Sequence, residues 1–575
     1  MKHLFRFFPK YRKEFLLGPF FKLVEASFEL CVPLVMRAII DVGIAQSDKG
    51  YMIKMALLLV LLALLGLISS VTAQYFAAKA SVGMVGGLKS DLFSHLQSLS
   101  YRELDTLGTP TMITRMTSDC NQVQSGLNLA LRLLLRSPFV VFGAMIMALT
   151  VDVNASMPFV IVIPILLAVT FAVMLVSIPM YRKVQGKVDG LVGDLRENLT
   201  GVRVLRAFRR EKEEIKEFDR RNSELKKEQN RVGAISALLN PVTYVIINFA
   251  VLFLIWRGAL RVDAGKLTQG DVVALYNYMG QILVELIKLA NLIIQITKAI
   301  ACANRIEKVF SVESSLSEPE NAPAETARGT VSFENVSFAY AGASDRSLSD
   351  ITFSCEAGET VGIIGGTGSG KTSLVSLIPR FYDVTEGKVK VNGNDVKDYP
   401  SGVLRRKFGV VPQQPTLFAG TIRENLLWGD ENADEETLKE AIYAAQAADI
   451  VRSKEKGLDE EVEQGGRNFS GGQKQRLTIA RALVRRPEFL ILDDSASALD
   501  FATDASLRKA LRALPYHPTV FIVSQRTSSV RYADVIVVLD EGKAVGIGTH
   551  DELLASCPVY REIHESQFRK EGASV

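Results

Sequence analysis

Residues 360–380 read TVGIIGGTGSGKTSLVSLIPR. The centre of this stretch, GGTGSGKT at 365–372, matches the pattern G-x-x-x-x-G-K-[ST]. An apolar run typical of a buried strand precedes the glycines, and a helical pattern follows them. In that setting the glycines allow backbone N–H groups to surround a polyphosphate, and the helix presents its positive end to it. The sequence therefore predicts a strand, a phosphate-binding loop and a helix of an α/β domain.

Two side chains of this loop have defined roles in the motif. Lys371 is expected to reach the β- and γ-phosphates of ATP, and Thr372 is expected to ligate Mg²⁺. A chance match in a glycine-rich loop is the alternative, and the flanking strand and helix argue against it. The nucleotide-binding residues predicted from the loop are Gly365, Gly366, Thr367, Gly368, Ser369, Gly370, Lys371 and Thr372.

A second motif lies downstream, where the apolar run FLILDD at 489–494 ends in two aspartates. A carboxylate at the end of a buried strand, near the phosphates, can hold the metal through its hydration shell. An apolar run ending in Asp is a weak signal by itself. Because it follows a phosphate loop on the same chain, Asp493 is predicted to contribute to the Mg²⁺ site.

The chain around these motifs divides into three parts. From residue 329 onward short β-runs alternate with helical stretches, which predicts a soluble α/β domain over 329–575. The preceding segment is polar and contains two prolines at 311–328, and it is interpreted as part of a linker over 307–328. Residues 1–306 are much more apolar and are predicted to form a membrane domain.

Three charge-free runs support the membrane assignment. They contain 24 residues between Lys54 and Lys79, 29 between Asp152 and Arg182, and 25 between Arg231 and Arg257. Each is long enough to cross about 30 Å of hydrocarbon as a helix. Three further spans are predicted over 16–42, 126–150 and 273–300, which gives six transmembrane helices in all.

The three further spans carry charged residues, among them Glu25, Glu29 and Glu285. A charge in lipid is costly, so these side chains should face a bundle interior or a wet cavity, where they would favour cationic amphiphiles. Pairing with Lys22 or Lys288, or a position at the lipid interface, is the alternative. The basic N-terminus is expected in the cytoplasm, together with the long loops 80–125 and 182–231.

Composition excludes several other classes of protein. The 575 residues carry a net charge of only +4, which argues against a nucleic-acid binder. Five scattered cysteines without a CxxC pair argue against a disulfide framework or a cysteine-based zinc site.

The segment FSGGQKQRL at 469–477 resembles the signature of ATP-binding cassette (ABC) proteins, whose usual form is LSGGQ. Together with the two phosphate-site motifs and the predicted spans, it gives a resemblance over almost the whole chain to a half-transporter of the exporter type. The stretches 104–119 and 197–208 are similar to the two intracellular loops that couple the membrane domain to the cassette. The resemblance implies a bacterial cell membrane as the location.

The resemblance assigns further residues. Tyr340 fits the aromatic residue that stacks on adenine, although an ordinary strand tyrosine is the alternative. Gln413 fits the glutamine that joins the metal site to the coupling loops, and a surface glutamine is its alternative. The signature, which binds the γ-phosphate of ATP held by the opposite cassette, corresponds to Ser470, Gly471, Gly472 and Gln473.

Two positions depart from the family pattern. Asp494 stands where the family has the glutamate that polarises the attacking water, and Gln525 stands where it has a histidine that contacts the γ-phosphate. Aspartate is one methylene shorter, and a misplacement of about 1 Å can cost about 10²-fold in rate. Gln525 cannot carry a positive charge. The two changes predict a site that binds ATP and hydrolyses it slowly.

In the exporter family that this chain resembles, the cassettes act as dimers. The resemblance therefore implies that this chain pairs with a different half-transporter. The signature of this chain would then complete the hydrolytic site of that partner. The predicted function is ATP-driven export of amphipathic small molecules by alternating access. The alternatives are an ATP-gated regulatory or non-transporting subunit, a lipid or peptide exporter, and an importer on the same fold.

Overall fold

The computed structural model describes residues 2–495 and 497–568. The chain divides into two compact units, one made of Met1–Gln97 and Pro110–Val312 and the other of Ser98–Thr109 and Glu313–Val575. A short piece of the first predicted intracellular loop thus belongs to the same unit as the α/β domain, although the sequence placed it within 1–306. Residue 1 and residues 569–575 of the predicted domains lie outside the described residues.

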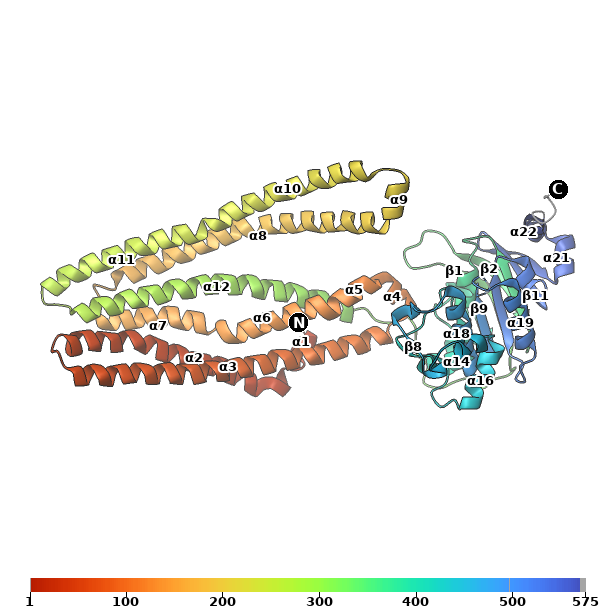
Figure 1. Cartoon of the computed structure of the whole chain (residues 1–575), viewed down its shortest axis with the longest axis horizontal. Helices are drawn as coiled ribbons and strands as arrows, with labels where there is room; N and C mark the ends of the chain where they lie inside the picture. Colours follow the sequence, from red (N-terminus) through yellow and green to blue (C-terminus); the bar gives the residue numbers. More distant parts are fainter. Residues whose placement is uncertain (1, 496, 569–575) are drawn as a thin grey trace. The chain divides into compact units, whose positions relative to one another are not determined.

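The first unit is a bundle of long helices that run side by side (Figure 1). Its elements are α1 (Lys2–Phe5), α2 (Phe8–Ala38), the π-helix η1 (Ile39–Ile44), α3 (Lys49–Ser98), α5 (Thr109–Thr114), the π-helix η2 (Arg115–Asp119), α6 (Cys120–Leu133), α7 (Arg136–Val151), α8 (Met157–Thr200), α9 (Val202–Ala207), α10 (Glu211–Ala237), α11 (Leu239–Asp263) and α12 (Gln269–Phe310). Helix α12 extends four residues into the range predicted as linker, because Ile306 and Val309 are buried and continue its apolar face.

Five segments of the described chain are long and apolar enough to cross a membrane. They are Lys49–Ser98, Thr109–Val151, Met157–Thr200, Glu211–Asp263 and Gln269–Phe310. Four of the six predicted spans fall within these segments, and a fifth, 153–181, begins four residues before Met157–Thr200 and otherwise lies in it. The sixth, 16–42, lies in α2 and η1, where Lys22, Glu25, Glu29 and Arg37 make the helix too polar to count as a span on composition.

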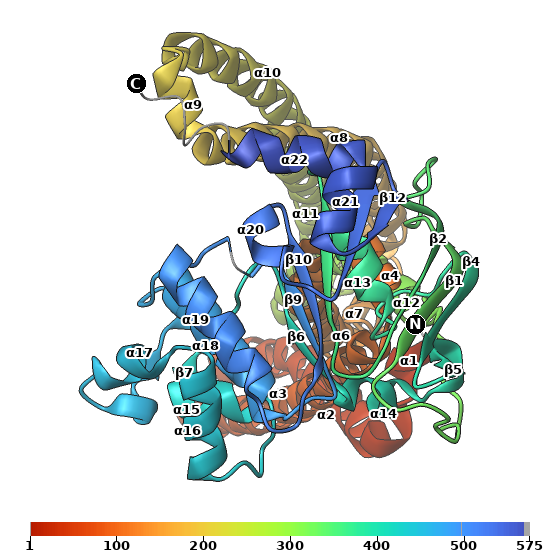
Figure 2. The ribbon, with the colours of Figure 1, turned by 90° about the vertical axis from the view of Figure 1, so that its right-hand side faces the viewer.

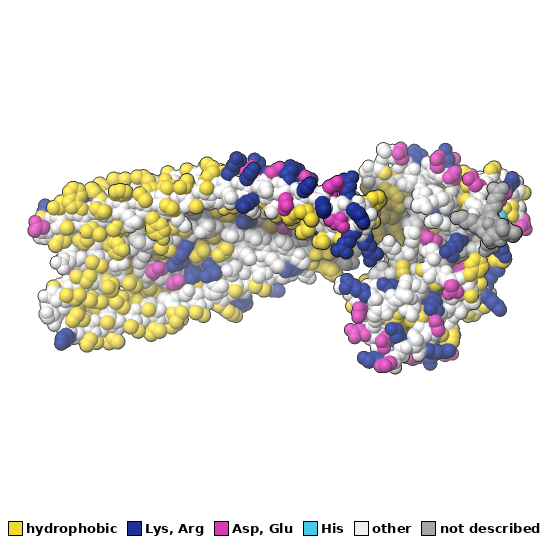
Figure 3. Space-filling view, turned by 45° about the horizontal axis from the view of Figure 1, so that its top comes forward, with side chains coloured by type: hydrophobic (Ala, Val, Ile, Leu, Met, Phe, Trp, Pro, Cys, Tyr) yellow, Lys and Arg dark blue, Asp and Glu magenta, His cyan; other side chains and the backbone are white. Residues whose placement is uncertain are grey.

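The charged residues of the predicted spans are largely paired with one another. Arg136 of α7 donates to Glu285 of α12 at 2.5 Å and to Glu29 of α2 at 2.6 Å. Lys288 also donates to Glu285, at 2.8 Å, and Lys22 donates to Glu25 at 2.5 Å. Figure 3 shows Lys, Arg, Asp and Glu side chains gathered among hydrophobic ones halfway along the helical unit.

These pairs decide between the two interpretations of the glutamates. Glu285 is buried, with 2% of its surface exposed, and Ser137 donates to its second oxygen at 2.9 Å. Its carboxylate is therefore neutralised inside the bundle and is not a free group facing a cavity. The pairing of Glu25 with Lys22 and of Glu285 with Lys288 is the alternative that the sequence left open.

The second unit is an α/β domain. Its strands are β1 (Val331–Phe338), β2 (Leu348–Cys355), β3 (Thr360–Gly365), β4 (Glu386–Val391), β5 (Asn394–Asp395), β6 (Phe408–Val411), β7 (Gly420–Thr421), β8 (Glu461–Val462), β9 (Phe489–Asp493), β10 (Thr519–Ser524), β11 (Val535–Asp540) and β12 (Lys543–Gly548). Its α-helices are α4 (Tyr101–Leu107), α13 (Lys371–Leu377), α14 (Ser401–Arg406), α15 (Ile422–Leu427), α16 (Glu435–Ala444), α17 (Ala448–Arg452), α18 (Gly471–Val484), α19 (Phe501–Arg512), α20 (Thr527–Val530), α21 (His550–Ser556) and α22 (Pro558–Phe568). Short 3₁₀ turns occupy η3 (Val396–Asp398), η4 (Gly457–Asp459) and η5 (Gln464–Gly466).

The main sheet has the strand order β12-β11-β3-β10-β9-β6, in which β12 alone is antiparallel. A second, antiparallel sheet has the order β2-β1-β4-β5, and β7 pairs with β8. Alternate residues of the main strands point to opposite faces, as β-structure requires. Leu490 and Ile522 pack with α18 and α19 on one face, whereas Ile491 and Phe521 pack with α13 on the other (Figure 2).

The parallel strands β3, β10 and β9 are neighbours, and this order brings three motifs together. Ser524 pairs with Ile364, directly before the phosphate loop, and Val523 pairs with Asp493. The carboxyl ends of these strands therefore form one edge, as expected of ligand sites in open α/β sheets. Gln525, which follows Ser524, emerges at the same edge.

Helix α4, from the first predicted intracellular loop, contacts the segment that follows α13. The Tyr382 hydroxyl donates to the Asp105 carboxylate at 2.6 Å. The rings of Tyr101 and Phe381 lie 4.7 Å apart. This short helix is thus attached to the α/β domain by a hydrogen bond and by aromatic contacts of Tyr101 with Phe381 and Tyr382.

Candidate functional site

The phosphate loop joins β3 to α13 in the way the motif requires. Gly368 and Gly370 have φ angles of 82° and 95°, which L-residues with side chains rarely adopt. A Cβ atom on Gly370 would also lie 2.7 Å from the Cδ2 atom of Leu348, whereas the position of a Cβ on Gly366 is open. Gly368 and Gly370 therefore allow the turn of the loop, and Gly366 leaves the loop backbone open to a ligand.

Lys371 lies under this loop, and 8% of its surface is exposed. Its ammonium group donates to the carbonyl oxygens of Gly365 at 3.0 Å and Gly366 at 2.5 Å. Burial lowers the pKa of Lys371, and the nearby Asp494 and Asp493 carboxylates oppose the shift. The hydrogen-bond acceptors of this ammonium group are neutral oxygens. A bound polyphosphate would therefore stabilise the charged form of Lys371.

Asp493 and Thr372 form the predicted metal pair. The Thr372 hydroxyl donates to Asp493 at 3.1 Å, and 6% of Asp493 is exposed. Burial raises the pKa of Asp493, and Asp494 adds to the shift. A hydroxyl and a carboxylate side by side are oxygen ligands that Mg²⁺ prefers, and a bound cation would restore the ionised form of Asp493.

Asp494 follows β9 in a left-handed conformation with φ 44°, which Asp tolerates better than most residues. Its backbone N–H donates to the Val523 carbonyl at 3.0 Å. Burial raises the pKa of its carboxyl group, while Lys371, Arg526 and a hydrogen bond from Gln413 lower it. The structure therefore brings Gln413 to Asp494, two residues that the sequence assigned to one site.

Tyr340 follows β1, and 36% of its surface is exposed. Its hydroxyl lies 2.9 Å from Ser373 Oγ, in the helix that carries Thr372. The ring packs edge-on against Tyr382 at 5.3 Å. Tyr340 is thus held beside α13 with part of its ring uncovered, as an adenine-stacking residue needs to be.

The signature segment forms the start of α18. The Ser470 hydroxyl accepts from the Gln473 backbone N–H at 3.3 Å, and the Gln473 side chain accepts from the Ser470 backbone N–H at 2.9 Å. This reciprocal cap satisfies two backbone donors at the helix start. Gly471 is exposed, and the position of a Cβ on it is open.

Two residues outside the sequence motifs lie close to the site. Tyr382 contacts both Tyr340 and Asp105, and Arg526 lowers the pKa of Asp494. Arg526 could have been found, because it follows Gln525 directly. Tyr382 carries no sequence signal of its own, since its importance depends on residues that lie far away in the chain.

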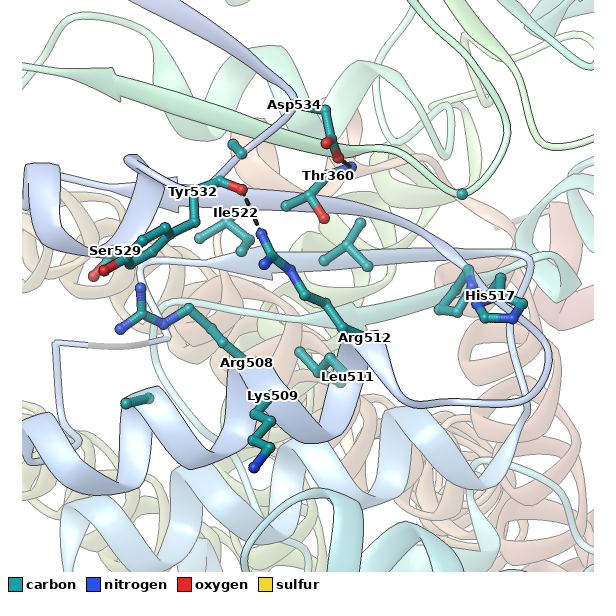
Figure 4. Close-up of a pocket in the computed structure, with 15 residues that line it drawn as sticks. Thr360, Arg508, Lys509, Leu511, Arg512, His517, Ile522, Ser529, Tyr532 and Asp534 are labelled. Atoms are coloured by element: carbon teal, nitrogen blue, oxygen red, sulfur yellow. Dashed lines mark hydrogen bonds between the residues drawn. The ribbon is translucent and has the colours of Figure 1, made fainter. Parts of the chain in front are cut away.

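A half-open pocket lies away from this site. It has a volume of about 720 Å³ and lies between α19 and the strand β10 (Figure 4). Arg508, Arg512 and Tyr532 line it, and none of the predicted nucleotide-binding residues is among its lining residues.

Two family models match the chain. The model described as ABC transporter transmembrane region matches residues 15–286, and the model described as ABC transporter matches residues 348–497. An uncharacterised ABC transporter ATP-binding protein of Mycobacterium tuberculosis is 37% identical over 562 residues, which cover 97% of this chain and 96% of the relative.

Two further relatives have more specific names. A Bacillus subtilis ATP-binding/permease protein named for multidrug export is 31% identical over 577 residues, covering 99% of this chain and 98% of that protein. The ATP-dependent lipid A-core flippase of Escherichia coli is 29% identical over 551 residues, covering 95% and 94%.

Among solved structures, a bacterial Atm1-family ABC exporter with ATP bound matches with a TM-score of 0.80. It is 24% identical and covers 98% of this chain and 99% of the other. This match establishes the fold, and the family models and relatives establish the membership. The chain belongs to the ABC transporters, and it is an exporter-type half-transporter with a membrane domain followed by one ATP-binding domain.

Proposed function

We propose that the chain is the subunit of a heterodimeric exporter that binds ATP at a weakly hydrolytic site of its own and completes the active site of a different half-transporter. One observation carries this proposal. Lys371, Thr372 and Asp493 keep the arrangement that ATP and Mg²⁺ require, whereas the neighbouring Asp494 and Gln525 are the residues that depart from the family pattern.

ATP, when bound, supplies the free energy of hydrolysis of its terminal phosphoanhydride bond, with Mg²⁺ neutralising charge on the phosphates. Lys371 would bind the β- and γ-phosphates, and Thr372 and Asp493 would hold the metal. Asp494 would orient and deprotonate water less well than the longer glutamate, because its carboxylate ends one methylene short. Gln525 could donate a hydrogen bond to the γ-phosphate without adding charge.

The signature supports a role toward a second cassette. Ser470 and Gln473 cap each other, and Gly471 leaves the start of α18 open to an approaching anion. In the proposed dimer this face would complete the partner's nucleotide site. ATP binding would close the two cassettes and move the coupling loops, and the cycle would reset after hydrolysis at the partner's site.

The substrate is proposed to be an amphipathic small molecule, which crosses the cell membrane of a bacterium outward. A relative named for multidrug export and one named as a lipid A-core flippase both support an amphiphile. The pairing of Glu25 with Lys22 and of Glu285 with Arg136 and Lys288 removes the reason to expect a preference for cations. In this proposal α2 is the sixth membrane helix. Its Glu29 pairs with α7, its Arg37 pairs with α12, and its Lys22 donates to Ser70 of α3.

The test compares ATP hydrolysis by the full chain alone in lipid nanodiscs with hydrolysis by the chain co-expressed with a candidate half-transporter. The proposal expects a nearly silent lone chain, an active pair, and a pair that loses substrate transport when its partner's equivalent of Lys371 is replaced. Lys371→Ala in this chain should abolish ATP binding at its own site and serves as the control.

Two results would contradict the proposal. Hydrolysis by the lone chain at the rate of the pair would mean that Asp494 and Gln525 suffice for catalysis, and a homodimeric exporter would then be the better interpretation. An active pair that changes conformation with ATP but moves no lipid, drug or peptide would favour a regulatory subunit.

A further inference from the structure

The segment after β10 is held by a side chain from the far end of the chain. Gln567, in the C-terminal helix α22, donates from Nε2 to the backbone carbonyl of Gln525 at 2.7 Å. Its Oε1 accepts from the backbone N–H of Thr527 at 2.9 Å and from the Thr527 hydroxyl at 3.0 Å. One amide therefore forms three hydrogen bonds to the two residues that flank Arg526.

The other end of the same segment is attached to α19. Arg508 donates to the Ser528 carbonyl at 2.7 Å, and Arg512 donates to the Tyr532 carbonyl, the contact drawn in Figure 4. Thr527 itself is fully buried, with 0% of its surface exposed. Residues 528–532 are thus anchored to α19, and the stretch that carries the Gln525 side chain is anchored to α22.

Gln525 itself is exposed, so burial does little to hold its side chain in one direction. The direction of an exposed side chain depends on the φ and ψ angles of its backbone. Gln567 forms hydrogen bonds to the carbonyl of Gln525 and to the N–H of Thr527. These bonds fix the two peptide planes that follow Gln525 in the chain.

We propose that Gln567 is a positioning residue, which holds the backbone of Gln525 so that its amide faces the γ-phosphate of ATP at the site formed by Lys371, Thr372 and Asp493. This inference rests on the proposed function, in which Gln525 contacts the γ-phosphate. It adds that the C-terminal helix α22, outside every nucleotide motif, controls how well this site distinguishes ATP from ADP.

The chemistry of the amide suggests a graded set of variants. Gln567→Met keeps the length and volume of the side chain and loses all three hydrogen bonds. Gln567→Glu keeps the acceptor for Thr527 and loses the donor to the Gln525 carbonyl. Glu565→Ala, at an exposed position of the same helix, is the matched control.

The measurement is the affinity of the full chain in nanodiscs for mant-ATP and mant-ADP, each with Mg²⁺. Only ATP has the γ-phosphate, so damage to the fold would weaken both nucleotides, whereas a misdirected Gln525 would weaken ATP alone. We expect Gln567→Met to lower the ATP affinity about ten- to a hundredfold, in line with the loss of one hydrogen bond to a charged group, and to leave the ADP affinity unchanged. The ATP affinity of Gln567→Glu should lie between those of Gln567→Met and the unchanged protein. Glu565→Ala should bind both nucleotides as tightly as the unchanged protein does.

A double variant separates this inference from the proposed function. Gln525→Ala should lower the ATP affinity by itself, and adding Gln567→Met should lower it no further, because both changes remove the same contact. If Gln525→Ala leaves the ratio of ATP to ADP affinity unchanged, the proposed place of Gln525 at the γ-phosphate is wrong. If Gln525→Ala changes the ratio and Gln567→Met does not, Gln525 keeps its place and the positioning role of Gln567 is refuted. Equal losses for ATP and ADP in Gln567→Met would also refute it.

Discussion

Lys371 is a buried ammonium group that donates to two backbone carbonyls and to the Ser369 hydroxyl. Burial lowers its pKa below that of an ordinary lysine. A cation kept in such surroundings destabilises the empty protein and favours the nucleotide-bound one. The residue therefore links stability to ATP binding.

This link gives a prediction for pH. Between the folded pKa of Lys371 and the ordinary lysine value of about 10.4, the unfolded chain binds more protons than the folded chain, so the stability of the nucleotide-free protein should rise with pH. Lys371→Met removes the titrating group and should remove this rise, together with the stabilisation by ATP. Thermal unfolding at pH 8 and pH 10, with and without MgATP, checks both effects. An identical pH dependence in the two proteins would contradict the assignment.

Asp494 and Gln525 give a second prediction at the residue scale. Asp494→Glu combined with Gln525→His restores both residues of the family pattern and should raise ATP hydrolysis by the lone chain about 10- to 100-fold. Steady-state phosphate release measures the rate, and the same pair of changes together with Lys371→Ala is the control. No gain in the double variant would mean that something other than these two residues limits hydrolysis at this site.

Among the elements, α6 and α12 lie especially close to each other. A Cβ atom on Gly126 of α6 would come within 2.2 Å of the Cβ atom of Ala299 in α12. That distance is far below van der Waals contact, and Ala299 has no longer side chain that could rotate away. The backbones would have to separate to admit a methyl group.

Gly126→Ala should therefore lower the free energy of unfolding of the membrane domain by about 1–3 kcal/mol, the usual cost of overpacking. Gly86→Ala is the matched control, because Gly86 also lies within a helix, α3, and the position of its Cβ is open. This control should be neutral or stabilise the helix by up to about 1 kcal/mol. Thermal unfolding in detergent compares the two, and equal midpoints would show that the helices adjust without cost.

The contact between α4 and the α/β domain depends on Tyr382. Burial raises the pKa of its hydroxyl, and Asp105 adds to the shift, so the group remains a donor through the neutral and mildly alkaline range. The same ring packs edge-on against Tyr340. One residue thus contacts both the predicted adenine-stacking ring and the helix from the intracellular loop.

Tyr382→Phe removes the hydroxyl and keeps the ring. We expect the affinity for ATP to remain within about twofold, because the contact with Tyr340 is retained, and the stimulation of ATP hydrolysis by transported substrate to fall several-fold, because α4 loses its hydrogen bond. Asp105→Asn should have a similar effect, and the two changes together should not add. Unchanged stimulation in both variants would show that this bond does not contribute to coupling.

At the scale of the whole membrane domain, one arginine joins three helices. Arg136 of α7 pairs with Glu29 of α2 and with Glu285 of α12, and Glu285 also accepts from Lys288. A buried ion pair of this kind adds little stability by itself, yet removal of one partner leaves an uncompensated charge. The network therefore specifies which helices lie together more than it stabilises them.

Arg136→Met should lower the free energy of unfolding by about 3–5 kcal/mol, because Glu285 would stay buried with less compensation. Arg136→Met combined with Glu285→Leu should recover most of that loss, since no buried charge of this pair is then left unmatched. Chemical denaturation of the protein in mixed micelles measures both variants. A double variant as unstable as the single one would show that the pair contributes directly to stability.

The sequence by itself determined the parts of this protein that depend on short contiguous stretches. The phosphate loop, the aspartate after β9, the signature and the charge-free spans are each recognisable because their chemistry requires particular residues within a few positions of one another. The same locality explains why the two departures, Asp494 and Gln525, could be named in advance.

Only the tertiary structure decided which distant residues meet. It paired Glu285 with Arg136, attached α4 to the α/β domain through Tyr382, and brought Gln567 to Gln525 over 42 residues of chain. Charge and helical pattern show that Glu285 needs a partner, and they do not show whether this partner is a neighbouring helix or a substrate. The choice depends on the packing of side chains from several helices and strands, and this packing is a property of the folded chain as a whole.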